Sequence, residues 1–133
     1  MKTNIATDKS QSQRLLRCGV SADTADMARY EDDEVPMMPW DWTTGSYGGT
    51  FPAWSLSRLL GLLPKEVYDE DDNSFYFSLA QEFPACDDYN AAYKPCWDDD
   101  DNLVEKFAPC PIEACVQLIE WLMENNYKLN EIN

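Results

Sequence analysis

The sequence predicts an α+β fold in which short helices pack on one face of a small antiparallel sheet. Residues 112–123 place apolar side chains at helical spacing, and residues 75–80 alternate in the period of a strand. The predicted strands follow one another through short connections, which suit antiparallel pairing because parallel strands require crossover helices. The chain has 133 residues, 44% of them hydrophobic, and this is enough for one core. Residues 1–133 are therefore predicted to form a single domain.

The sequence of the N-terminal region predicts a hairpin of two helices. Residues 8–18 begin with a plausible N-cap, Asp8, and Gln11 stands three positions later, as in a capping box. Gly19 follows as a residue that ends a helix. Ser21 then offers a second N-cap, for a short helix that ends near residue 28. We therefore expect a compact helix–turn–helix arrangement.

The sequence after this hairpin predicts a loop followed by another helix. Residues 30–50 are rich in Pro and Gly, which break regular structure, so we expect a loop with at most a short strand. Ser55 is a clear N-cap, and the leucines after it recur at helical spacing until Pro64. A helix of about two turns is expected between these two residues.

Two strands and a long helix complete the predicted fold. Residues 75–80 and 89–94 are the predicted strands, joined by a polar connection. Pro111 suits the first position of the last helix, which is amphipathic, and residues 127–133 after it are expected to fray. The apolar face of this helix consists of Ile112, Cys115, Val116, Ile119, Leu122 and Met123.

The negative charge is concentrated in the middle of the chain. Residues 31–105 hold eighteen Asp and Glu against three Lys and Arg, a balance of −15. Residues 1–30 carry +2 and residues 106–133 carry −2, so the whole chain has a net charge of −15. A surface that binds phosphates needs clustered Lys or Arg, and this distribution argues against direct binding of nucleic acid.

The composition also excludes several kinds of reaction site. The chain has no His, which removes the usual general base and the commonest transition-metal ligand. The five cysteines include no Cys-x-x-Cys pair, and we expect free thiols, with Cys18 and Cys115 buried on helix faces. Residues 69–73 and 98–102 begin like EF-hand loops, but both lack the later Gly and Glu. We therefore predict no catalytic residue, no cofactor and no metal site.

Three stretches of the chain resemble a known family when taken together. They are residues 13–27, residues 52–65, which open with Pro-Ala-Trp-Ser-Leu-Ser, and residues 102–122. The pattern is similar to a family of small uncharacterised proteins of gut bacteria, often carried on prophages or other mobile elements. The resemblance implies an accessory role in such a setting and implies no particular chemistry.

The leading hypothesis is a non-enzymatic interaction protein that presents an acidic face to a basic protein partner. In its sharpest form the carboxylates would imitate the phosphates of a nucleic acid. No apolar run is long enough to span a membrane and no export signal is visible, so we expect a cytoplasmic location without membrane contact. The candidate interaction residues are Asp69, Glu70, Asp71, Asp72, Asp98, Asp99, Asp100, Asp101, Trp40 and Trp42.

The alternative hypothesis is a module that binds a small ligand or a carbohydrate. It uses the Trp-rich segment 40–54, in which aromatic rings stand beside acids. This hypothesis predicts a concave aromatic pocket, whereas burial of these rings in the core would argue against it.

Overall fold

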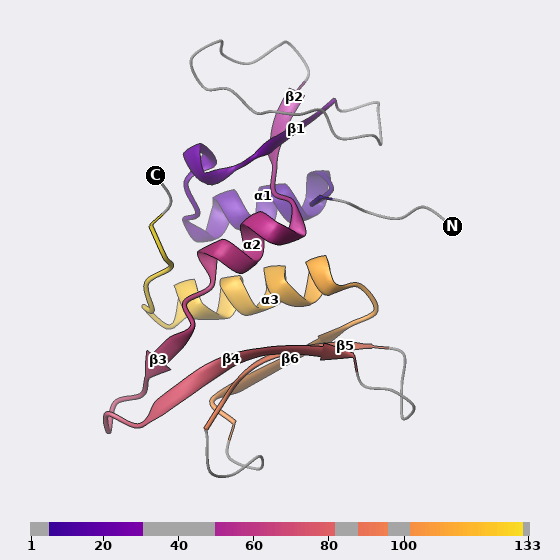
Figure 1. Ribbon diagram of the computed structural model, residues 1–133. Helices are drawn as coiled ribbons and strands as arrows, with labels where there is room; N and C mark the ends of the chain where they lie inside the picture. Colours follow the sequence, from indigo (N-terminus) through magenta and orange to yellow (C-terminus); the bar gives the residue numbers. More distant parts are fainter. Residues whose placement is uncertain (1–5, 31–49, 82–87, 96–101, 132–133) are drawn as a thin grey trace.

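A computed structural model describes residues 6–30, 50–81, 88–95 and 102–131 of the chain (Figure 1). The helices are α1 (Lys9–Cys18), α2 (Leu56–Leu62) and α3 (Pro111–Glu124), with a short 3₁₀ helix, η1, at Ala22–Thr24. The strands are β1 (Met27–Tyr30), β2 (Thr50–Ala53), β3 (Glu66–Tyr68), β4 (Ser74–Gln81), β5 (Tyr89–Lys94) and β6 (Val104–Ala108). Among these residues, no helix is long and apolar enough to cross a bilayer.

The elements form layers above a four-stranded antiparallel sheet. The strand order is β3-β4-β5-β6, and α3 lies directly on β5 and β6. Helices α1 and α2 pack against α3 on its other side, and the two-stranded sheet of β1 and β2 lies beyond them (Figure 1). The predicted α+β class, with helices on one face of an antiparallel sheet, is confirmed.

Strand pairing decides which side chains face α3. Directly opposite residues of an antiparallel pair share a face, and Phe77, Tyr93 and Val104 form one such row on the helix side. The neighbouring row of Ala80, Asn90 and Phe107 lies on the other face. Helix α3 packs on the face that carries Phe77, Tyr93 and Val104.

Helix α3 is the centre of the core. It has seven buried residues, and all of them except Ile112 are 0% exposed. Pro111 stands at its first position, as predicted, because the missing N–H of proline would have no partner in the first turn. The apolar stripe read from the sequence faces the sheet and the other helices, so the prediction for this element is confirmed.

The ends of α1 also follow the sequence prediction. The Asp8 carboxylate accepts a hydrogen bond from the N–H of Gln11 at 2.8 Å, and the Gln11 side chain accepts one from the N–H of Asp8 at 3.0 Å. At the other end, Gly19 has a φ of 112°, a conformation that favours glycine. The N–H groups of Gly19 and Val20 bond to the carbonyl groups of Leu16 and Leu15, which completes a Schellman motif.

The predicted second helix is wrong. The helical turn at Ala22–Thr24 is followed at once by strand β1, so no helical hairpin forms. The physical reason is tertiary: β1 pairs with β2, and Arg29 in β1 is buried with its guanidinium donating to the carbonyls of Ala6 and Thr7. These long-range bonds outweigh the weak helical preference of a short segment.

The expectation that the C-terminal segment frays is also wrong for residues 127–131. The N–H of Asn130 donates to the carbonyl of Leu62 at 2.8 Å. The Asn130 side-chain amide donates to the carbonyls of Gly61 and Leu63, each at 3.1 Å. One asparagine thus caps the end of α2, whose last carbonyls would otherwise lack partners, and fixes the segment to the body of the protein.

Candidate acidic–aromatic interaction site

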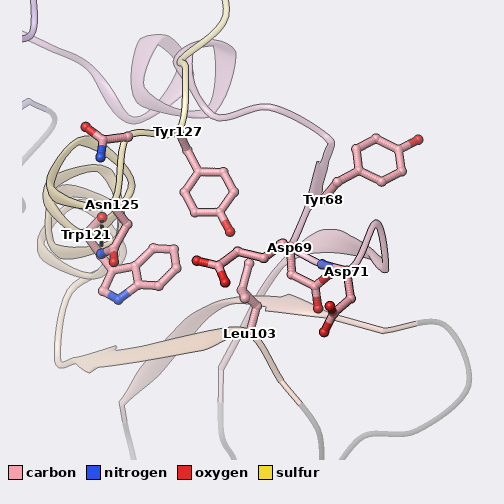
Figure 2. Close-up of a pocket in the computed structure, with 9 residues that line it drawn as sticks. Tyr68, Asp69, Asp71, Leu103, Trp121, Asn125 and Tyr127 are labelled. Carbon is pink, nitrogen blue, oxygen red and sulfur yellow. Dashed lines mark hydrogen bonds between the residues drawn. The ribbon is translucent and has the colours of Figure 1, made fainter.

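A hollow of about 510 Å³ opens where the turn between β3 and β4 faces the end of α3. We call it the acidic–aromatic hollow. Figure 2 shows Trp121 and Tyr127 on one side, Tyr68, Asp69 and Asp71 on the opposite side, and Leu103 below them. Its lining residues are Tyr68, Asp69, Glu70, Asp71, Leu103, Trp121, Asn125, Asn126 and Tyr127. None of these is basic.

The end of α3 supplies the aromatic side of the hollow. Asn126 has a φ of 67°, and the N–H of Tyr127 returns to the carbonyl of Leu122 at 2.9 Å. This is a second Schellman motif, with asparagine in the position where glycine is commonest. The reversal of the chain places the Tyr127 ring on Trp121, with ring centroids 5.5 Å apart and planes inclined by 22°. The helix ending therefore builds a stacked pair of rings.

The β3–β4 turn supplies the carboxylates. Asp69 organises the turn, because its side chain accepts from the N–H groups of Asp71 and Asn73, each at 2.9 Å. The Asn73 side chain donates to the same carboxylate at 3.1 Å. The side chains of Glu70 and Asp71 make no hydrogen bond or ion pair with any residue that the structure describes. One acid thus holds the turn, and the next two remain available.

The electrostatics of the hollow are negative at neutral pH. Hydrogen bonds from the backbone and side chain of Asn73, together with the N–H of Asp71, lower the pKa of Asp69. Burial raises the pKa of Tyr127, and the charges of Asp69 and Glu70 raise it further. The carboxylates across the hollow therefore act on the aromatic side, and the raised pKa keeps the Tyr127 phenol neutral at neutral pH.

This arrangement suits a cationic group. A Lys ammonium or Arg guanidinium is attracted to the face of an aromatic ring, best of all to tryptophan, and pairs with carboxylates. Burial raises the pKa of the Cys115 thiol to about 12, so this cysteine does not supply a reactive thiolate at neutral pH. The acids and rings of the hollow thus offer two kinds of contact to a positive charge.

A second group of acids lies between α1 and α3 and is paired within the chain. The Arg14 guanidinium donates to Glu113 through two bonds of 2.8 and 3.0 Å, and it also donates to Glu120. Gln11 and Gln117 add further bonds to the Glu113 carboxylate, at 3.0 and 2.8 Å. The donors of Arg14 are therefore directed at carboxylates of the protein itself. We call this group the arginine cluster.

The structure brings together only part of the predicted interaction surface. Asp69, Glu70 and Asp71 line the acidic–aromatic hollow, whereas Asp72 belongs to the same turn without lining it. Asp98 to Asp101, Trp40 and Trp42 lie outside the described residues. Trp54, the last ring of the Trp-rich segment, is 0% exposed, and its indole N–H donates to Thr24 at 2.9 Å.

Sequence reasoning missed the aromatic side of the hollow. Trp121 stands at the margin of the apolar stripe of α3, and Tyr127 follows the two asparagines that end the helix. The one sequence feature that could have indicated these rings is the position of Trp121 beside the apolar stripe and not within it.

Comparison of the chain with protein-family models, with curated proteins and with solved structures finds no match. The resemblance to proteins of mobile elements therefore stays a prediction.

Proposed function

We propose that this protein is a non-enzymatic interaction module that binds a basic protein partner through the acidic–aromatic hollow. The observation that carries the proposal is the position of Glu70 and Asp71 across from the stacked rings of Trp121 and Tyr127. Within the part of the chain that the structure describes, neither acid has a side-chain partner. A Lys or Arg side chain of the partner would lie against the rings and pair with the acids.

The charge of the whole chain supports the same proposal. A net charge of −15 creates a field that draws a basic partner toward the protein and raises the rate of association. Such steering acts on any basic surface, so specificity has to come from the shape of the hollow and its rings. In the mobile-element setting that the resemblance implies, a protein that normally binds nucleic acid would be one such basic partner.

The test measures binding of a fluorescent Lys-rich peptide by anisotropy at low salt. The variant combines Glu70→Gln with Asp71→Asn, which removes both charges and keeps the size of the side chains. Exposed ion pairs contribute about 0.2–1 kcal/mol each, so loss of two pairs should raise the dissociation constant by roughly two- to thirtyfold. The same affinity should fall as salt is added, because exposed charges are screened.

A matched control separates local from overall charge. The combination of Asp23→Asn with Glu131→Gln removes the same net charge at two exposed acids that do not line the hollow. We expect this control to bind like the wild type, within about twofold. Equal weakening in both variants would show that only the total charge matters, and failure of the wild type to bind would reject the proposal.

A further inference from the structure

The outer edge of β6 is open among the residues that the structure describes. Among the strands that the structure describes, β6 is the last of the sheet and pairs with β5 alone. In an antiparallel pair, alternate residues direct their N–H and C=O groups away from the partner strand. Part of the backbone of Val104–Ala108 therefore faces outward, in the arrangement that accepts an additional strand.

Two hollows flank this edge and meet at Trp121. One is the acidic–aromatic hollow, whose lining residue Leu103 directly precedes β6. The other has a volume of about 150 Å³ and lies between β6 and α3, where Lys106, Gln117, Glu120, Trp121 and Glu124 line it. The open edge and the candidate site are thus parts of one continuous surface.

We propose that an extended, basic segment of the partner pairs with β6 as a fifth strand and continues into the acidic–aromatic hollow. This inference rests on the function proposed above and specifies the form of the ligand. Backbone hydrogen bonds along β6 would supply affinity for an extended chain, and the hollow would select for Lys or Arg.

The side chains beside the edge define what this segment looks like. Lys106 shares with Ala91 the face that α3 covers, and Glu124 is an exposed acid on that side. Lys106 is one cation in surroundings that also hold Glu120, Glu124 and the acids of the β3–β4 turn, so the side remains negative. Basic side chains of an added strand would point to this face at every second residue, about 7 Å apart.

The opposite face of the edge is apolar at one position. Phe107 is 47% exposed on the side of the sheet that α3 does not cover. A β-branched residue on the added strand would cover this ring as a cross-strand neighbour. The segment is therefore expected to alternate basic and β-branched residues, and a shift of one position would place both kinds of side chain on the wrong face.

The test uses a peptide of about seven residues in which Lys and Val alternate, and two N-methylated forms of it. One form is methylated at every Lys and the other at every Val, so each blocks the hydrogen bonds of one edge of the strand. An added strand pairs through one edge only. We expect one methylated form to bind about tenfold or more weakly than the parent and the other to bind like it.

Hydrogen exchange gives a second readout on the full chain. Binding of the parent peptide should slow exchange at amides within Val104–Ala108, because their outward N–H groups gain partners. Equal binding of both methylated forms, equal loss in both, or exchange at β6 unchanged by bound peptide would overturn strand addition. In those cases the fluorescent Lys-rich peptide would still report on the hollow, so loss of one proposal is separable from loss of the other.

Discussion

The arginine cluster and the acidic–aromatic hollow are both built around carboxylates on or near α3, but only the first contains its own cation. In the arginine cluster, Arg14 bonds Glu113 and Glu120 from the neighbouring helix. In the hollow, Glu70 and Asp71 face aromatic rings, and none of the described residues that line the space is basic. The comparison teaches that acidity has two roles in this protein: one set of acids joins elements of the fold, and the other is left for a partner.

Burial explains why the acids of the arginine cluster are paired within the protein and those of the hollow are not paired with a described residue. The side chains of Arg14, Glu113 and Glu120 are 28%, 22% and 26% exposed, so unpaired charges there would be costly. Glu70 and Asp71 are exposed, and water stabilises their charges without a partner. A cation supplied from outside can therefore pair with them at low desolvation cost.

The largest effect on stability is expected from a substitution that disrupts the arginine cluster. Arg14→Ala leaves two partly buried carboxylates without their positively charged partner, and we expect the free energy of unfolding to fall by about 1–3 kcal/mol in urea titrations. Arg17→Ala is the matched control, because Arg17 is exposed on the same helix, and it should change stability by less than about 0.5 kcal/mol. Equal effects of the two substitutions would contradict a structural role for the cluster.

A smaller effect concerns the pH dependence of stability. Burial alone would raise the pKa of Glu113, but hydrogen bonds from Arg14, Gln11 and Gln117 outweigh it and leave the pKa lowered. A carboxyl with a lowered folded pKa contributes stability above its unfolded value, and this is lost as pH falls through the folded value. Below about pH 4.5, the wild type should therefore lose more stability than Glu113→Gln does. Parallel curves between pH 6 and pH 3 would contradict this assignment.

The parts of the fold that the sequence predicts are those with a local signal. The capping box of Asp8 and Gln11, the N-cap at Ser55, the alternation in β4 and the apolar stripe of α3 all act within a few residues, and the structure confirms them. Each of these signals can be recognised from residues close together in the chain, so no knowledge of tertiary contacts was needed to predict the element.

The parts that were missed depend on contacts between distant residues. β3 has only three residues and β6 only five, too few to show a clear period, and their pairing with β4 and β5 defines them. The hollow combines the turn after β3 with the end of α3, more than forty residues apart in sequence. The acids of that turn could be predicted from composition, but the rings of Trp121 and Tyr127 opposite them could not.

The smallest expected effect is on stability, and its sign distinguishes the acids of the hollow from those of the arginine cluster. Glu70→Gln combined with Asp71→Asn removes two like charges from a turn that also holds Asp69 and Asp72, and neither side chain bonds to a described residue. Relief of repulsion should leave the free energy of unfolding unchanged or raise it by up to about 0.5 kcal/mol, and added salt should remove the gain. Urea titrations at low and high salt measure this. A loss of more than about 1 kcal/mol would mean that these acids hold the fold together as Glu113 does, and that they are not kept for a partner.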